Sequence, residues 1–404
     1  MSSQTNQPRV KRRRVFYIPG YDPIPPRRYR ELYRSESARQ AAISGYEISV
    51  SPKTGEGLYG WHVHSVQDGA EVHTDVEVLV WSDIVRSSMS NSIAATYLQM
   101  LRTAWIYIST GVLWRLMRLR KGPVIAALYP IVMLIAQLLV AMAVVIGLTV
   151  LLAPVLSLVA LVLSIGVAYV MMLWFRKIDN KLFVYYLMHD YAYSAASGGK
   201  TPPELAGRLS EFSNAIAAAL TDETDEVLIV GHSSGAHLGV TVLADLIRSG
   251  RVGADGPELS FLTLGQVVPM VSFLPNAYDL RADLRFLSKR EDLAWVDISA
   301  PGDGCAFALC DPVAVSGVAD ADQRWPLVLS AAFTQTLSAE RWRALRWRFF
   351  RLHFQYLCAF DHPDRYDYFR VTAGPLSLGH RFADRKPSGS RIVRSVSKYV
   401  SVQA

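Results

Sequence analysis

Apolar and polar residues alternate in short runs along both halves of the chain, and one long apolar stretch separates the halves. Before that stretch, residues 14–23 read as a strand that runs into a Pro/Gly turn, and residues 27–44 repeat with a helical period. Three further strands are predicted from period-two alternation: "YEISVSP" at 46–52, "YGWHVHSV" at 59–66 and "AEVHTDVEVLVW" at 70–81.

The second half shows the same alternation of elements. Helical patterns cover 181–194, 203–220, 235 to about 249 and a stretch ending at 287, and strands are predicted at 226–230, 259–265 and 293–301. Strands that alternate with helices indicate a mainly parallel sheet. Because neither half has enough strands for a complete sheet, we expect one α/β domain into which the apolar stretch is inserted.

The apolar stretch carries no charged residue from Pro123 to Phe175. A membrane-spanning helix needs about 20 apolar residues, so the stretch predicts two spans, Val124–Leu151 and Val155–Phe175, joined near Ala153-Pro154. Two other interpretations stay open, namely a helical hairpin buried in a soluble core and a re-entrant hairpin. The expected organisation is 1–121 and 177–384 as the two parts of the domain, 122–176 as the hairpin and 385–404 as a basic, Ser-rich tail.

Positive charge is concentrated beside this stretch. The formal net charge is +7, and the basic residues that flank the stretch are Arg115, Arg118, Arg120 and Lys121 before it and Arg176, Lys177 and Lys181 after it. The positive-inside rule then places both flanks, and the domain, on the cytoplasmic side of the inner (cytoplasmic) membrane, where anionic lipid is the expected partner. Nucleic acid is disfavoured because no binding motif accompanies the charge, and the N-terminus lacks the apolar stretch of a signal peptide.

Two segments have open assignments. Residues 92–121 place apolar side chains on one helical stripe, which fits either a helix lying against lipid headgroups or a helix packed on the domain; the stripe consists of Leu98, Leu101, Trp105, Ile108 and Val112. The tail from Arg385 is predicted to be solvated or to touch the membrane.

The segment "VLIVGHSSGAHLGV" at 227–240 carries the strongest chemical signal. A strand, then Gly-x-Ser-x-Gly, then a helix is the pattern of a nucleophile elbow. The glycines at 231 and 235 leave room for a strained turn, which places the hydroxyl of Ser233 at the carboxyl edge of the sheet. A Gly-rich turn without chemistry is the competing interpretation.

With this motif the chain resembles the lipase/esterase-like members of the α/β-hydrolase superfamily. The resemblance rests on "GHSSG", on "YIPGYDP" near the start, and on "FLTLGQ" and "WVDISAPGDG" after the elbow. It implies Ser233 as nucleophile and an oxyanion hole formed by the backbone N–H of Ser234 and that of Gly20 or Tyr21.

The order Ser, acid, His in this superfamily limits the remaining candidates. Asp303, just beyond the strand "LAWVDIS", is the first choice for the acid, with Asp297 and Asp311 as alternatives. Three histidines follow the acid, and the choice among them stays open: His353, His380 and His362.

Each histidine has its own local pattern. His353 in "FFRLHFQYL" fits a last strand and resembles the His-x-x-Tyr ending of some lipase-like hydrolases, although the spacing fits a helix equally well. His380 follows 366–375, which reads as a strand, and His362 precedes a proline as a turn residue would.

The expected function is therefore a membrane-anchored serine esterase or lipase that cleaves a lipid-derived acyl ester or thioester and needs no metal or organic cofactor. Transfer of the acyl group to an alcohol instead of water uses the same chemistry and stays open. The alternative is a membrane-tethered, non-catalytic binding or scaffold module. The three cysteines, Cys305, Cys310 and Cys358, show no metal-ligand spacing and are expected to be reduced thiols.

Overall fold

The sheet takes four strands from each side of the apolar stretch. The computed structural model describes residues 9–55, 57–89 and 92–404, and in this part of the chain eight strands form one sheet in the order β2-β3-β4-β1-β5-β6-β7-β8. The strands are β1 Arg12–Ile18, β2 Glu47–Pro52, β3 Gly60–Gln67, β4 Ala70–Val78, β5 Glu226–His232, β6 Glu258–Leu264, β7 Ala294–Ser299 and β8 Leu327–Ser330. All pairs are parallel except β2–β3 and β3–β4, which confirms the predicted α/β class and mainly parallel sheet.

The central strand β5 is buried on both faces of the sheet. Val227 and Ile229 belong to one hydrophobic core, whereas Leu228 and Val230 belong to the core on the opposite face. Strands that are covered on both faces need an unbroken apolar run instead of strict alternation. The run "VLIV" before the Gly-x-Ser-x-Gly motif is therefore explained by the position of β5 inside the sheet.

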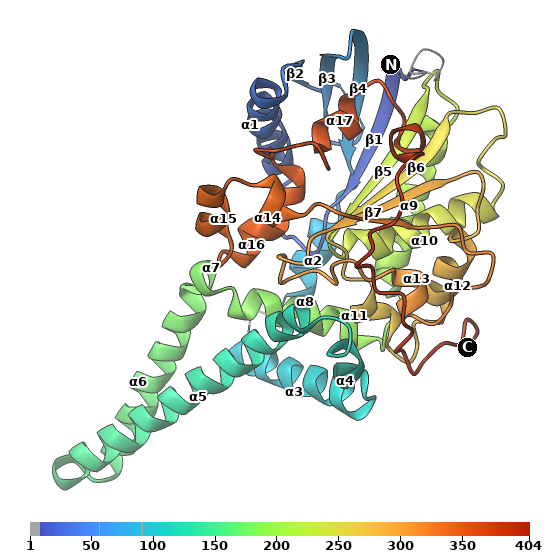
Figure 1. Cartoon of the computed structure of the whole chain (residues 1–404). Helices are drawn as coiled ribbons and strands as arrows, with labels where there is room; N and C mark the ends of the chain where they lie inside the picture. The colour runs from blue at the N-terminus through green and yellow to red at the C-terminus, as the bar shows by residue number, and fades with distance from the viewer. Residues whose placement is uncertain (1–8, 56, 90–91) are drawn as a thin grey trace.

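Helices cover both faces of the sheet (Figure 1). One core is closed by α2 Ser82–Ser88, α9 Pro203–Ala219, α10 Gly235–Arg248, α12 Tyr278–Leu287 and the short α13 Pro312–Val315. The other is closed by α1 Arg27–Ser44, α14 Phe333–Thr336, α16 Phe349–His353, α17 Tyr368–Ala373 and α18 Leu378–Phe382. The remaining short helices are α11 Pro269–Ser272, α15 Ala339–Leu345 and η1 Phe354–Leu357.

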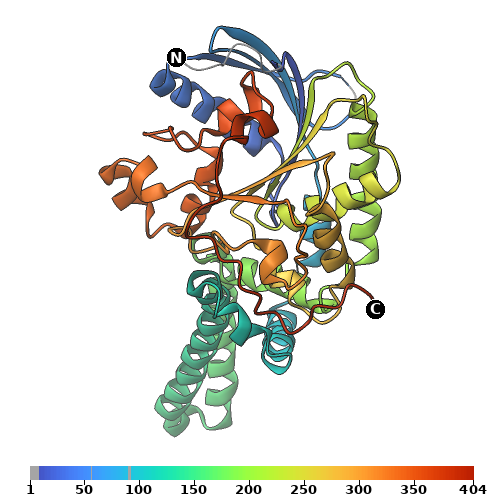
Figure 2. The same cartoon turned by 45° about the vertical axis from the view of Figure 1, so that its right-hand side comes forward.

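The apolar stretch forms a helical hairpin that projects from the domain, as two views of the chain show (Figures 1 and 2). Its helices, α5 Lys121–Leu156 and α6 Leu158–Lys177, are long and apolar enough to cross a membrane. Only 17% and 22% of their most apolar windows are buried inside the protein. A hairpin in a soluble core would be mostly buried, so that interpretation does not fit this arrangement.

The chain reverses later than the sequence suggested. Pro154 lies inside α5, two residues before its end, and the turn falls at Ser157, which has a positive φ of 50°. The N–H of Ser157 donates to the carbonyl of Ala153 and so completes the last turn of the helix. Proline removes one backbone donor near a helix end but does not itself force the reversal.

Four helices connect the hairpin to the domain: α3 Ile93–Ser109, α4 Val112–Leu116, α7 Asp179–Leu182 and α8 Val184–Ala196. Helix α3 buries Thr96, Met100, Thr103 and Tyr107 on one side. It leaves Leu98, Leu101 and Trp105 exposed on the other. Helix α3 therefore packs on the protein and presents an apolar outer side, and its contact with lipid headgroups stays a prediction.

One expectation for the C-terminal part is wrong. Within 366–375 the structure has α17 Tyr368–Ala373 and no strand, because the side chain of Asp367 caps the helix by accepting from the N–H groups of Phe369 and Arg370. The last strand is β8, which the sequence analysis missed. Most residues of the tail 385–404 are exposed, although Ile392 exchanges backbone hydrogen bonds with the segment around Cys310 and Val396 is buried.

Candidate active site

The site lies where the strand order changes direction. β1 pairs with β4 on one side and with β5 on the other, so the loops after β1 and β5 leave the sheet next to each other. In open α/β sheets, ligands bind at such a switch point, beyond the carboxyl ends of the strands. The loop after β1 contains Gly20, and Ser233 follows the last residue of β5.

Ser233 has a strained backbone that only small neighbours permit. Its φ is 57°, in the left-handed region, which costs free energy for a residue with a side chain. A Cβ added to Gly231 would lie 2.7 Å from the carbonyl oxygen of Gly235, and a Cβ on Gly235 would lie 2.1 Å from that of Ile18. The two glycines are therefore required by close backbone approaches on both sides of the serine.

Backbone N–H donors lie around the serine. A Cβ added to Gly20 would be 2.9 Å from the Cβ of Ser233 and 3.4 Å from its Oγ, so the loop after β1 runs directly against the nucleophile candidate. Within the described part of the chain, the N–H groups of Gly20, Tyr21 and Ser234 donate to no protein acceptor. The three candidates for the oxyanion hole are thus free to donate to a ligand.

Asp303 and His353 form a buried pair. Nδ1 of His353 lies 2.7 Å from Oδ2 of Asp303, and the two residues are 5% and 2% exposed. The carboxylate is held by two further donors, the N–H of Cys305 to Oδ1 at 2.9 Å and the hydroxyl of Tyr356 to Oδ2 at 3.0 Å. The Tyr356 hydroxyl also accepts from the N–H of Ala300 at 2.9 Å, so its direction is fixed.

The second ring nitrogen of His353, Nε2, is available to accept a proton. Nε2 is buried and has no hydrogen-bond partner among the described residues. Its ring lies beside the end of β6, where a Cβ on Gly265 would be 3.1 Å from Cε1 of His353. The preceding residue, Leu264, accepts from the N–H of Ser233 at 3.0 Å. The serine therefore contacts the last residue of β6, and the imidazole lies by the residue that follows it.

His232, immediately before the serine, supports this imidazole. The two histidine rings are 4.7 Å apart between centroids. Nε2–H of His232 donates to the carbonyl of His353 at 3.0 Å, and its Nδ1 faces the hydroxyl of Tyr17 at 3.4 Å. Burial, with a smaller effect of His353, lowers the pKa of His232 to about 3, so it is neutral at physiological pH. The sequence analysis excluded His232 as the base because it precedes the acid along the chain. It did not predict that His232 contacts His353.

The alternative acids have structural roles. The Thr263 hydroxyl donates to Asp297 at 2.6 Å inside the sheet, and burial raises the pKa of Asp297 to about 7. Asp311 caps α13 through the N–H groups of Val313 and Ala314, each at 3.0 Å. Neither carboxylate contacts a histidine.

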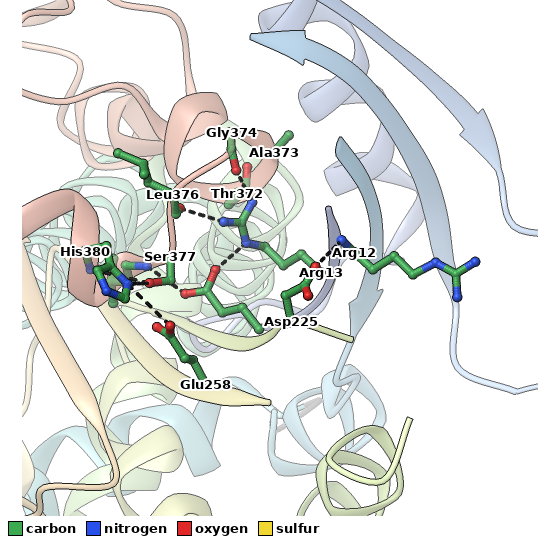
Figure 3. A network of polar contacts seen from close by, with 12 residues as sticks. Arg12, Arg13, Asp225, Glu258, Thr372, Ala373, Gly374, Leu376, Ser377 and His380 are labelled. Atoms are coloured by element: carbon green, nitrogen blue, oxygen red, sulfur yellow. Dashed lines mark hydrogen bonds and ion pairs between the residues drawn. The ribbon is translucent and has the colours of Figure 1, made fainter. Parts of the chain in front are cut away.

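The other two histidines lie away from the serine. His380 is at the amino edge of the sheet, where its Nδ1 contacts the hydroxyl of Ser377 at 2.8 Å and the carboxylate of Glu258 at 3.3 Å (Figure 3). His380 was a candidate because a strand was predicted at 366–375. That segment contains helix α17 instead, and His380 lies at the amino edge of the sheet, opposite to the edge where Ser233 lies. His362 is exposed in a loop, and its N–H donates to the carbonyl of Thr336.

Asp190 on α8 was missed by the sequence analysis. Burial raises the pKa of this carboxyl to about 7, and the neighbouring His353 partly opposes the shift. Its charge also acts on Tyr191 and on Cys305, which lies two residues after Asp303. The available signal was a lone carboxylate within the aromatic helical run "YYLMHDYAYS".

Two groups of described residues bring metal-ligand atoms within 4.8 Å of one another. Asp303, Cys305 and His353 form the first, but there the histidine and the carboxylate already bind each other. His64, Glu71 and His73 form the second, on the solvent face of β3 and β4. There Nε2 of His64 lies 2.7 Å from a carboxylate oxygen of Glu71 on the neighbouring strand, a contact between polar cross-strand side chains.

Comparison with known proteins does not identify a family. No protein-family model, no curated protein and no solved structure matches the chain. The interpretation of the site therefore rests on its geometry.

Proposed function

We propose that the protein is a membrane-anchored serine hydrolase with a fold of the α/β-hydrolase type. One observation carries the proposal: Nδ1 of His353 is held by Asp303 while Nε2 is buried and unpartnered, and the ring lies 4.7 Å from that of His232, the residue before Ser233. An imidazole oriented in this way is prepared to accept a proton at Nε2. Burying a polar nitrogen without a partner costs free energy, which suggests that the partner is a substrate-bound state.

The chemistry follows from these positions. Nε2 of His353 removes the hydroxyl proton as Oγ of Ser233 attacks the acyl carbon, and Asp303 stabilises the imidazolium. The N–H groups of Ser234 and of Gly20 or Tyr21 receive the developing oxyanion. The proton then passes from Nε2 to the leaving oxygen or sulfur, and an acyl-enzyme remains. Water attacks this ester by the same route and releases the acid.

The hairpin suggests the substrate class. Exposed apolar helices that project from a domain need an apolar environment, and a bilayer supplies it. A site at the root of such a hairpin meets esters or thioesters that partition into lipid. The basic residues at both flanks favour the cytoplasmic face of the inner membrane for the domain.

The direct test is covalent labelling by a fluorophosphonate probe, which reacts with an activated serine. We expect the wild-type protein and Ser210→Ala to be labelled and Ser233→Ala to remain unlabelled. Ser210 is a matched control because it is an exposed serine on α9. Folded wild-type protein that is not labelled would reject the hydrolase and favour the non-catalytic binding module.

A further inference from the structure

Residues 343–351, "RALRWRFFR", form an exposed basic and aromatic surface directly before His353; we call it the arginine segment. It covers the end of α15, the connecting turn and the start of α16. All four of its arginines are exposed: Arg343, Arg346, Arg348 and Arg351. The hydrolase chemistry uses none of them.

These cations are not neutralised by the protein. Among the described residues, no carboxylate lies within ion-pair distance of any arginine of the segment, and Arg343 donates only to the carbonyl of Ala339. Arg341, two residues earlier, differs, because it lies 3.4 Å from Asp361 and 3.7 Å from Glu36. The segment is therefore a concentrated positive patch with unused binding capacity.

Aromatic side chains lie between the arginines and are also exposed to solvent. Trp347 is 72% exposed and Phe349 is 50% exposed. Large exposed apolar groups beside unpaired cations mark an interaction surface. Tryptophan and arginine together are typical of the boundary between headgroups and acyl chains, where the ring meets the acyl region and the guanidinium meets phosphate.

The arginine segment lies at the root of the hairpin. The ring of Phe350 is 4.7 Å from that of Phe183 and 6.0 Å from that of Tyr186, so α16 packs on the turn between α7 and α8 where the chain leaves α6. Figure 1 shows α15 and α16 beside α7, and α3 on the other side of the root. Helix α3 has its own exposed apolar side chains, among them Leu101 and Trp105. Exposed apolar side chains are thus present on α3 as well as in the arginine segment.

We propose that the arginine segment docks on anionic lipid headgroups of the bilayer that holds the hairpin, with Trp347 and Phe349 at the level of the acyl chains. The proposal rests on insertion of the hairpin, which is part of the proposed function. The bilayer is the favoured occupant because the surface is continuous with the root of the hairpin and carries only positive charge. Docking would hold the turn before His353 at the membrane surface, where lipid esters arrive.

The experiment measures the depth of Trp347. The full chain is reconstituted in nanodiscs whose lipids carry bromine on the acyl chains, which quenches tryptophan fluorescence on contact. The chain has 9 tryptophans, so each contribution is read as the difference between the wild type and a Trp→Phe variant. Three variants are compared: Trp347→Phe, Trp174→Phe in the hairpin and Trp325→Phe near the start of β8.

We expect Trp347→Phe to remove a brominated-lipid-quenched component in nanodiscs that contain phosphatidylglycerol, and Trp325→Phe to remove none. Replacing Arg343, Arg346, Arg348 and Arg351 by Gln, or adding 0.5 M salt, should abolish the quenching of Trp347. The reason is that each basic residue near an anionic leaflet contributes roughly fivefold to association.

The outcomes separate this inference from the proposed function. Quenching of Trp174 without quenching of Trp347 would overturn the docking surface and leave the hairpin inserted. Absence of quenching at both positions would overturn membrane insertion and the docking surface together. Fluorophosphonate labelling of Ser233 reports the hydrolase in either case.

Discussion

The two edges of the central sheet carry polar clusters of opposite character. At the amino edge, Arg13 and Glu226 form a fully buried ion pair at 2.5 Å. The remaining donors of Arg13 bond to the carbonyls of Gly374 and Leu376, each at 2.8 Å, as Figure 3 shows. At the carboxyl edge, Asp303 and His353 are also buried and paired, but one ring nitrogen is left without a partner.

The difference separates a structural ion pair from the pair that the proposed function makes catalytic. Each side-chain nitrogen of Arg13 and each carboxylate oxygen of Glu226 has a protein partner, which makes the fold specific, whereas Nε and one Nη of the neighbouring Arg381 have none among the described residues. At the carboxyl edge the unpartnered nitrogen of His353 and the left-handed backbone of Ser233 both cost free energy. Arg13 and Glu226 come from β1 and β5, whereas Asp303 follows β7 and His353 ends α16, so the two clusters can be changed independently within one protein.

The largest expected effect is on activity at the carboxyl edge. His353→Ala should lower kcat for a soluble short-chain ester by at least about 10³-fold, because it removes the base and the acid of both half-reactions. His380→Ala should retain activity near that of the wild type, since His380 lies at the other edge. Steady-state hydrolysis in detergent measures both. Equal losses in the two variants would contradict the assignment of His353.

The next effect is on stability at the amino edge. Glu226→Ala leaves the buried guanidinium of Arg13 without its carboxylate and should lower the free energy of unfolding by about 3–5 kcal/mol. Glu258→Ala, at a partly exposed pair with His380, should cost less than about 1 kcal/mol. Denaturant unfolding measures both, and kcat per folded molecule should be unchanged in each. A large loss of kcat in folded Glu226→Ala would show that the edges are not independent.

The contrast also explains what the sequence could predict. The elbow at Ser233 and strands β5 to β7 were predictable because a buried strand followed by two spaced glycines is a local pattern. The pairing of Asp303 with His353 was only one of several possibilities, because a contact across 50 positions has no local signature. His380 was misplaced because capping by Asp367 changed a predicted strand into a helix. Asp190 was missed since nothing in its helix indicates that α8 faces the site.

A smaller effect is expected from the hydroxyl that orients the acid. Tyr356→Phe removes the donor to Asp303 at 3.0 Å while the ring remains. A lost hydrogen bond to a charged group corresponds to about 1.5–3 kcal/mol, so kcat should fall about 10- to 100-fold. The apparent pKa of the kcat profile should also change, because the tyrosine hydroxyl stabilises the ionised carboxylate. A change in stability without a change in the pH profile would reduce Tyr356 to a packing role.

The smallest effect concerns Asp190, whose pKa burial raises to about 7, partly opposed by His353. A carboxyl with a raised pKa in the folded state holds a proton that the unfolded chain has released, so its contribution to stability is present at low pH and is lost as the pH rises to about 7. Asp190→Asn keeps the shape and removes the titration. Its melting temperature relative to the wild type should therefore increase between pH 5 and pH 8. Asp255→Asn, at an exposed loop position, should show no such trend, and a constant difference for Asp190→Asn would mean that the carboxyl is already ionised at pH 5 in the fold.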